Sequence, residues 1–380
     1  MRQRKILPIV RNAAAGFRGG EGRMYLMDRI CWMGKTGTAL FLAGVLAIGM
    51  PGQAQAAKTA VKSARTGKTA EEVLNVPTDH GALRVDGANL VDAKGEKYQL
   101  YGMSTHGIAW FPQYINRDTF RTLQDDWGTN CVRLAMYTEE YNGYCSGGNK
   151  EELKRLMEEG VSYATELGMY VIVDWHVLND KDPNVHRAEA AEFFDQMAAK
   201  WKDQDNVIYE ICNEPNSGTS WEMITAYANE IIPVIRKHDR DAVIIVGTPS
   251  WSQEIDEALK RPLEFDNVMY ALHFYAGTHT DWLRNRVREC VDRGLPVFIS
   301  EFGMCDASGN GANDFGQADQ WMELIDRYGL SYCCWNLANK DERSSVIRAD
   351  CGKVSGWEES ELSESGQWIR RRFRGEAQKR

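Results

Sequence analysis

The 380-residue chain lacks several patterns that would assign it to a function class. It has 45 Lys and Arg against 54 Asp and Glu, a net charge of −9, and no basic stripe, which argues against nucleic acid as a partner. No C-x-x-C, H-x-H or H-E-x-x-H spacing occurs, so nothing in the sequence indicates a metal site, and no cofactor is expected. With 43% hydrophobic and 26% charged residues and no repeat, the composition is that of a globular protein.

The N-terminal region has the pattern of a bacterial secretory signal. Its apolar run, 38–50, is shorter than the roughly 20 residues that a membrane-spanning helix needs. Small residues at Ala54 and Ala56 then form a small-x-small cleavage pattern. We therefore expect residues 1–56 to be a leader, 57–77 a flexible lead-in, and the mature protein to be secreted. A retained membrane anchor is the alternative. The true start is open among Met1, Met24, Met27 and Met33.

Removal of this leader makes the chain more acidic. Residues 1–56 hold 8 of the 45 basic and 2 of the 54 acidic residues, which leaves 37 against 52, or −15. Such a charge suits a neutral substrate better than a polyanion. We expect a monomer that binds neither nucleic acid nor, after cleavage, a membrane. Export permits disulfides, but four of the eight remaining cysteines lie in apolar runs, so at most one bridge is expected.

From residue 98 onward, short apolar runs alternate with amphipathic stretches. The runs are 98–103, 130–136, 169–175, 207–212, 242–247, 268–274, 296–300 and 331–335. The helical stretches are 117–126, 150–167, 187–200, 221–238, 280–293 and 316–328. Eight apolar strands alternating with helices predict a closed (β/α)8 barrel.

We assign this barrel to residues 78–374, with a short β-hairpin at 83–92 at its start and a basic tail at 375–380 after it. An open doubly wound sheet is the competing fold. It usually has five or six strands, and no G-x-G-x-x-G follows the first strand here.

Two carboxyl groups stand at strand ends, where barrel enzymes carry their functional groups. Glu214 follows the fourth predicted strand and Glu301 the seventh, so ring closure places them across the barrel from each other. Retaining glycoside hydrolysis uses two carboxyl groups about 5–5.5 Å apart, whereas inversion needs about 6.5–9.5 Å to admit a water. The pair therefore predicts glycoside hydrolysis.

The neighbours of these two residues fit a division of labour. Arg133 and Tyr275 are candidates to lie beside Glu301 and keep it ionised, as a nucleophile requires. Burial and a nearby negative charge would raise the pKa of Glu214, as a general acid requires.

The series of motifs resembles glycoside hydrolase family 5, the endoglucanase (cellulase) family, in its Bacillus-type branch. The resemblance covers residues 82–373. Its motifs are GMSTHGIAW (102–110), NCVRLAMY (130–137), VIVDWH (171–176), VIYEICNEP (207–215), YALHFYAGTH (270–279), VFISEFG (297–303) and WNLANK (335–340).

The resemblance implies roles for individual residues. Glu214 resembles the family's acid/base and Glu301 its nucleophile. Asn213 resembles the group that holds the sugar 2-hydroxyl, and Arg133 and Tyr275 resemble the residues that hydrogen-bond the nucleophile. The histidines implied to line the cleavage subsite are His106, His176 and His273, and the residues implied to contact the sugar chain are Trp110, Tyr137, Trp335 and Lys340.

Tryptophans also divide by position. Trp110 and Trp335 follow strands and are expected to stack on sugars, whereas Trp175 and Trp251 fit a core or a sugar-binding role equally well. Those in helical stretches, expected to pack inside, are Trp127, Trp201, Trp321 and Trp368.

These observations predict a secreted, retaining endo-β-1,4-glucanase acting on β-glucan polysaccharides or oligosaccharides. Two alternatives stay open. The same mechanism could serve mannan, xyloglucan or mixed-linkage glucan, or the barrel could bind carbohydrate without catalysis.

Overall fold

The computed structural model describes residues 79–376. The expected leader 1–56, the lead-in 57–77 and residues 377–380 of the predicted tail lie outside this range. Among the described helices, none combines the length and the apolar character needed to cross a membrane.

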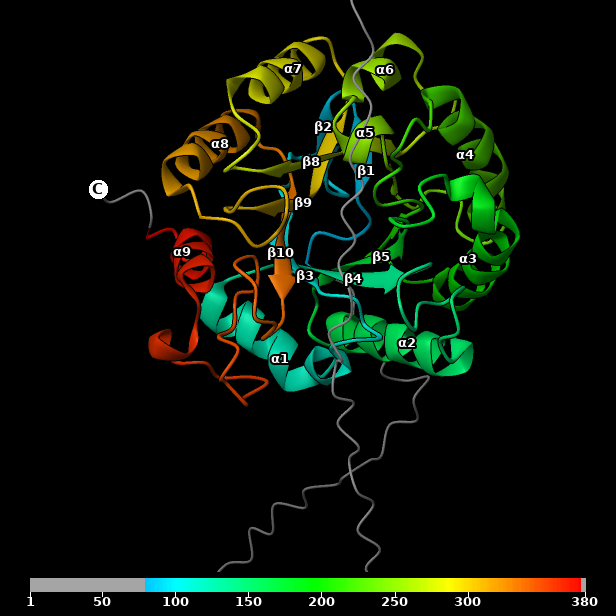
Figure 1. Ribbon diagram of the computed structural model, residues 1–380. Helices are drawn as coiled ribbons and strands as arrows, with labels where there is room; N and C mark the ends of the chain where they lie inside the picture. Colours follow the sequence, from blue (N-terminus) through cyan, green and yellow to red (C-terminus); the bar gives the residue numbers. More distant parts are fainter. Residues whose placement is uncertain (1–78, 377–380) are drawn as a thin grey trace, which may run out of the picture. The chain divides into compact units, whose positions relative to one another are not determined.

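Eight parallel strands close into a barrel (Figure 1). The strands are β3 (Tyr101–Thr105), β4 (Cys131–Tyr137), β5 (Tyr170–His176), β6 (Val207–Glu210), β7 (Ile244–Val246), β8 (Val268–Tyr275), β9 (Val297–Gly303) and β10 (Tyr332–Leu337). Each pairs with the next, and β10 returns to β3. Because side chains on both faces are covered, the strands read as continuous apolar runs in the sequence. The predicted barrel and its strand order are confirmed.

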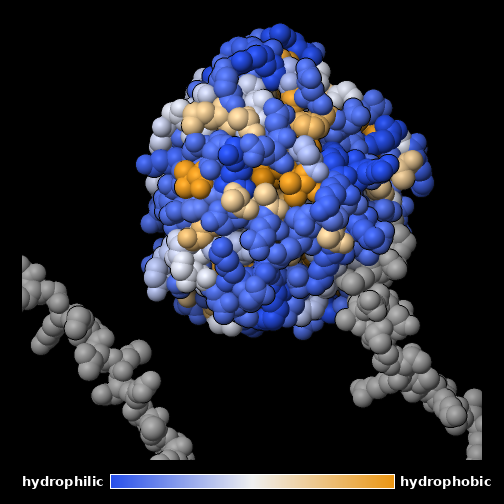
Figure 2. All heavy atoms as spheres, turned by 90° about the vertical axis from the view of Figure 1, so that its right-hand side faces the viewer, coloured by the Kyte–Doolittle hydropathy of each residue, from blue (hydrophilic) through white to orange (hydrophobic). Residues whose placement is uncertain are grey.

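Helices surround the barrel and bury one face each against it (Figure 1). They are α1 (Arg117–Thr122), α2 (Lys150–Glu166), α3 (Arg187–Trp201), α4 (Trp221–Arg236), α5 (Pro249–Ser252), α6 (Ile255–Lys260), α7 (Asp281–Asp292), α8 (Phe315–Tyr328) and α9 (Glu364–Phe373). Side-chain caps begin several of them: Asn149 accepts from the Glu152 amide and Ser220 from the Met223 amide. The outer surface on the α3 and α4 side is mostly hydrophilic, with small separate hydrophobic patches (Figure 2).

Several elements differ from the sequence expectation. The first helix ends at Thr122 and continues as a π-helical turn over Leu123–Trp127. Two short helices, α5 and α6, lie between β7 and β8, where no helix was expected. Helix α9 was also missed, and it docks by burying Trp368, Ile369 and Phe373.

A β-hairpin lies at the start of the described chain, as predicted. Strands β1 (Arg84–Asp86) and β2 (Asn89–Val91) pair antiparallel. Leu83, Leu90 and Leu100 join one apolar cluster with residues inside the barrel, among them Cys131 and Ile172. This cluster is separate from the larger core formed between strands and helices. The eight cysteines between Cys131 and Cys351 are all free.

Candidate active site

A cleft of about 560 Å³ opens at the C-terminal ends of the strands. The sequence-predicted residues that line it are His106, Tyr137, His176, Glu214, His273, Tyr275, Glu301, Trp335 and Lys340. Arg133 and Asn213 are fully buried and hydrogen-bond to each other. Trp110 lies beside the cleft, with its ring 5.1 Å from that of Tyr137. The barrel therefore gathers all twelve predicted residues in one region.

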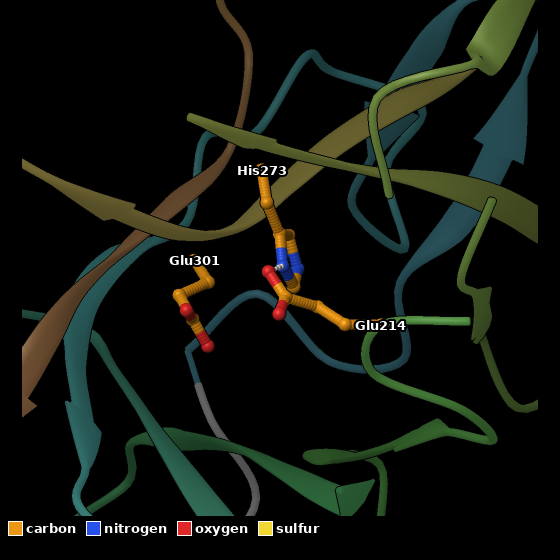
Figure 3. Close-up of side chains that lie close together, drawn as sticks. All are labelled: Glu214, His273 and Glu301. Atoms are coloured by element: carbon orange, nitrogen blue, oxygen red, sulfur yellow. Dashed lines mark hydrogen bonds and ion pairs between the residues drawn. The ribbon is translucent and has the colours of Figure 1, made fainter. Parts of the chain in front are cut away.

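The two carboxyl groups meet inside this cleft (Figure 3). Oxygens of Glu214 and Glu301 and a ring nitrogen of His273 all lie within 4.8 Å of one another. This close approach is nearer to the separation of about 5–5.5 Å that retaining hydrolysis uses than to the about 6.5–9.5 Å of inversion. Both glutamates are more than nine-tenths buried, so little water screens their interaction.

Two donors converge on Glu301. The Tyr275 hydroxyl donates to its Oε1 at 2.8 Å, and Arg133 Nη1 donates to its Oε2 at 3.3 Å. Burial raises the pKa of Glu301, and so does the negative charge of Glu214 when Glu214 is ionised, while His273 and Arg133 oppose the rise. The donors therefore stabilise the ionised carboxylate against the effect of its burial. A carboxylate that attacks carbon as a nucleophile must be ionised.

Glu214 has a different environment. Its Oε1 lies 2.9 Å from His273 Nδ1. Burial raises the pKa of Glu214 to about 8, with the charges of Asp174 and Glu210 adding to the rise and Arg133 opposing it. Glu214 is therefore a protonated acid near neutral pH, in contact with a ring that stays uncharged because burial lowers the pKa of His273 to about 4.

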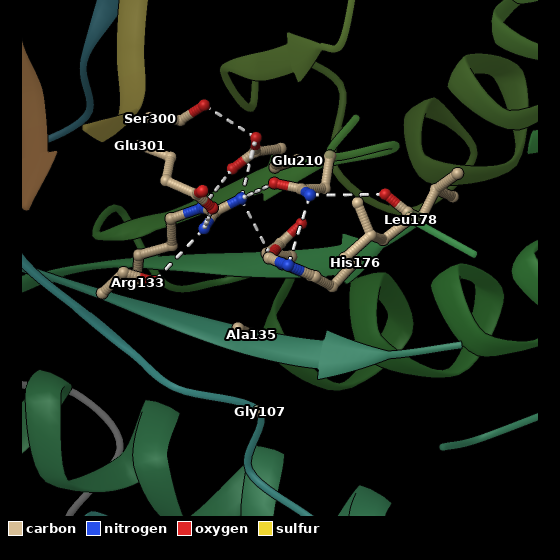
Figure 4. Close-up of polar contacts among 12 residues, drawn as sticks. Gly107, Arg133, Ala135, His176, Leu178, Glu210, Ser300 and Glu301 are labelled. Atoms are coloured by element: carbon tan, nitrogen blue, oxygen red, sulfur yellow. Dashed lines mark hydrogen bonds and ion pairs between the residues drawn. The ribbon is translucent and has the colours of Figure 1, made fainter. Parts of the chain in front are cut away.

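The Arg133 side chain contacts polar groups from neighbouring strands of the barrel (Figure 4). Its Nε donates to Glu210 Oε2 at 2.7 Å, and its Nη2 lies 3.0 Å from Asp174 Oδ2. The same Nη2 donates to Asn213 Oδ1 at 2.6 Å. With no solvent exposure, the guanidinium offsets buried negative charge and orients the Asn213 amide.

His176 completes the orientation of Asn213. The amide Nδ2 of Asn213 lies 3.2 Å from His176 Nε2, and His176 Nδ1 lies 2.6 Å from Asp174 Oδ2. Since an amide nitrogen only donates, Nε2 accepts and Nδ1 carries the proton toward Asp174. The Asn213 side chain is thereby held from both ends.

Aromatic rings and a lysine form one wall of the site. The Trp335 ring is stacked at 5.2 Å on His176, and the Trp110 ring at 5.3 Å on His106. Lys340 Nζ lies 3.3 Å from His106 Nε2. These flat rings beside polar groups suit the faces and hydroxyls of sugars.

The structure settles the role of the two ambiguous tryptophans. Trp175 is fully buried and contacts Phe193 and Phe194, so it belongs to the core. Trp251 is 45% exposed and lines the cleft on the side of β7. The four tryptophans that were expected to pack inside are buried: Trp127, Trp201, Trp321 and Trp368.

Sequence reasoning missed several residues of the site. Asp174 lies inside β5 and Glu210 is the last residue of β6. Both lie within apolar runs of the sequence, and a charged residue in such a run was the signal that could have found them. Glu342, two residues beyond Lys340, pairs with that lysine and lines the cleft. Ser300 contributes a buried hydroxyl that contacts both His273 and Glu210.

Glu214, His273 and Glu301 are also the one group in the described chain whose spacing could hold a metal ion. Both ring nitrogens of His273 are already engaged, Nδ1 with Glu214 and Nε2 with Ser300 Oγ at 2.9 Å. An ion here would have to displace these hydrogen bonds. The site is better matched to holding protons than to holding a cation.

A (β/α)8 barrel that brings two buried carboxyl groups together at its strand ends defines the class of barrel glycoside hydrolases. Comparison with known proteins gives the family. The model of cellulase, glycosyl hydrolase family 5, matches residues 91–341. The chain belongs to this family. Its assignment to a Bacillus-type branch stays a prediction.

Individual relatives agree. Endoglucanase A of Butyrivibrio fibrisolvens is 52% identical over 313 residues, which is 80% of this chain and 72% of that protein. Endoglucanase 5 of Pectobacterium carotovorum is 44% identical over 78% of this chain and 58% of its own length. The catalytic domain of Thermobifida fusca endoglucanase Cel5A, solved with cellotetraose, is 39% identical with a TM-score of 0.74, over 78% of this chain and 98% of that one.

Proposed function

We propose that the protein is a retaining endo-β-1,4-glucanase that hydrolyses internal bonds of β-1,4-glucan. The observation that carries this proposal is the approach of Glu214 and Glu301 within 4.8 Å in a cleft lined by aromatic and polar side chains. Relatives named endoglucanase and a similar catalytic domain that holds cellotetraose support the substrate class.

The reaction has two steps. In the first, Glu301 attacks the anomeric carbon while Glu214 gives its proton to the leaving oxygen, which forms a covalent sugar ester. Formation of the ester removes the negative charge of Glu301 from beside Glu214. Glu214 can then stay ionised and act as a base. In the second step, Glu214 takes a proton from water, and the resulting nucleophile releases the sugar and regenerates Glu301.

Other groups support these steps. The donors Tyr275 and Arg133 hold Glu301 in place, and Asn213 is oriented to bind the sugar 2-hydroxyl. Trp335 lines the cleft and would lie under the sugar that is cleaved, and Trp110, Tyr137 and Lys340 would extend the site beside it. We also propose that the protein is secreted, on the strength of the signal pattern ending near Ala56.

Two variants test the assignment. Glu301→Gln should abolish covalent labelling by a 2-fluoro β-cellobioside and should still bind cello-oligosaccharides. Labelling at another residue would reject Glu301 as the nucleophile. Glu214→Ala should regain turnover with a dinitrophenyl cellobioside plus azide, because that leaving group needs no acid and azide replaces the activated water. A lack of rescue would reject the acid/base role.

Product analysis separates the substrates. We expect carboxymethylcellulose to be cleaved internally, with faster loss of viscosity than release of reducing ends. Preferential cleavage of mannan, xyloglucan or lichenan would change the assigned substrate but not the proposed mechanism. A chelator should leave the rate unchanged, and inhibition that added Zn²⁺ reverses would indicate a metal.

A further inference from the structure

A chain of hydrogen bonds continues from Glu214 into the barrel interior. His273 Nδ1 lies 2.9 Å from Glu214 Oε1, and His273 Nε2 lies 2.9 Å from Ser300 Oγ. The Ser300 hydroxyl donates to Glu210 Oε1 at 2.7 Å. Ser300, His273 and Glu210 are each 0–1% exposed, so no bulk water competes for these bonds.

The contacts of Glu210, at the far end of this series of hydrogen bonds, determine which atom donates in each bond. Glu210 accepts from Arg133 through both oxygens, at 2.7 Å from Nε to Oε2 and 3.2 Å from Nη2 to Oε1. Burial raises the pKa of Glu210, and the charge and hydrogen bonds of Arg133 oppose that rise. A guanidinium only donates, so both Glu210 oxygens act as acceptors, as in an ionised carboxylate. The Ser300 hydroxyl therefore directs its single proton toward Glu210.

The same reasoning extends to the catalytic carboxyl group. Because the Ser300 proton points to Glu210, Ser300 Oγ accepts from His273, and His273 carries its proton on Nε2. The uncharged ring then has a lone pair on Nδ1, which faces Glu214 Oε1. A lone pair opposite a carboxylate would repel it, whereas a lone pair opposite a carboxylic acid accepts its proton.

We propose that Ser300 and Glu210 are positioning residues that fix the His273 tautomer and thereby keep Glu214 protonated until substrate binds. This inference rests on the proposed role of Glu214 as acid/base. No bond other than hydrogen bonds changes: the proton stays on Glu214 and leaves only to the glycosidic oxygen.

Glu214 has other titratable and charged neighbours that set its background. From β4, β5, β6, β8 and β9 they are Arg133, Asp174, His176, Glu210, His273, Tyr275 and Glu301. All of these side chains remain when the Ser300 hydroxyl is removed, but Glu210 then loses one of its hydrogen-bond donors. The tautomer therefore needs a measurement of its own besides the pH profile.

Ser300→Ala tests the proposal. Without the hydroxyl, His273 is free to place its proton on Nδ1 and donate it to an ionised Glu214, which favours the charged form. We expect the basic limb of the kcat/KM profile to move down by about one pH unit on cellotetraose. Ser300→Thr keeps a hydroxyl and should restore the limb, and Ser331→Ala, which removes another buried hydroxyl, should not move it.

A spectroscopic measurement tests the tautomer without relying on activity. Nitrogen-15 NMR of the full-length protein should show His273 protonated on Nε2 in the unmodified enzyme and on Nδ1 in Ser300→Ala. Protonation on Nδ1 in the unmodified enzyme would overturn the proposal, as would an unmoved basic limb in Ser300→Ala. Failure to cleave any β-glucan would instead overturn the proposed function, and the NMR result would still decide the tautomer.

Discussion

At the scale of single residues, the site places two identical side chains in different environments, which favour different protonation states. Glu301 receives hydrogen bonds from a hydroxyl and a guanidinium, both of which favour its ionised form. Glu214 faces an uncharged imidazole and buried acids, which favour its protonated form. The same carboxyl group thus becomes a nucleophile or an acid according to its neighbours.

The hydroxyl of Tyr275 gives a direct test of this difference. Tyr275→Phe removes the 2.8 Å hydrogen bond to Glu301 and keeps the ring. A hydrogen bond to a charged group contributes about 1.5–3 kcal/mol, so kcat should fall roughly 10- to 100-fold. Steady-state kinetics on an aryl cellobioside measures this change.

Tyr328 supplies the matched control, because its hydroxyl donates at 2.9 Å to Asp292 on the surface, away from the cleft. Tyr328→Phe should leave kcat unchanged. Equal losses in the two variants would show that the Tyr275 effect is not exerted through Glu301.

At the scale of elements, the pairing of β8 with β9 positions the tyrosine. Tyr275 lies opposite Gly303 in the register of the two strands. A Cβ added at Gly303 would lie 2.7 Å from the Tyr275 ring, which is closer than side chains tolerate. The glycine therefore leaves the space in which the ring reaches Glu301, two residues earlier on β9.

Gly303→Ala should consequently lower kcat by displacing the Tyr275 ring, with a smaller effect on the KM for cello-oligosaccharides. A double-mutant cycle checks the cause. In a Tyr275→Ala background the added methyl group has no ring to displace, so the second substitution should cost little further activity. Additive losses in the double variant would contradict this explanation.

The elements also show what the sequence could predict. Strands buried on both faces appear as apolar runs, and the barrel order followed from counting them. Asp174 and Glu210 were not found, because their role depends on which strands become neighbours around Arg133. Helix α9 was missed because three consecutive arginines interrupt the apolar pattern of its sequence. Its buried face is formed by Trp368, Ile369 and Phe373.

At the scale of the whole molecule, the fold buries several carboxyl groups at a cost in stability that depends on pH. Burial raises the pKa of Glu140 and of Asp174 to about 7, and that of Glu214 to about 8. Their ordinary values are 4.5 for glutamate and 3.8 for aspartate. Between the two ranges the folded protein binds more protons than the unfolded chain, so its stability falls as the pH rises.

We therefore expect the melting temperature to be highest near the ordinary carboxyl range, at about pH 5, and to fall through pH 8. Glu140 allows a test outside the catalytic groups. It is 5% exposed, its Oε1 accepts from the Asn179 amide, and its Oε2 has no hydrogen-bond partner. Glu140→Gln removes the ionisation and keeps the shape, so the decrease in melting temperature between pH 5 and 8 should become smaller.

Glu139→Gln is the matched control, since that neighbouring glutamate is far more exposed and its Oε1 lies 2.6 Å from His186 Nε2. Differential scanning calorimetry of the three proteins at both pH values would measure the effect. A decrease of equal size in all three would show that the buried Glu140 carboxyl does not contribute to it. A larger decrease in Glu140→Gln would show that the folded protein holds this carboxyl ionised, contrary to the effect of its burial.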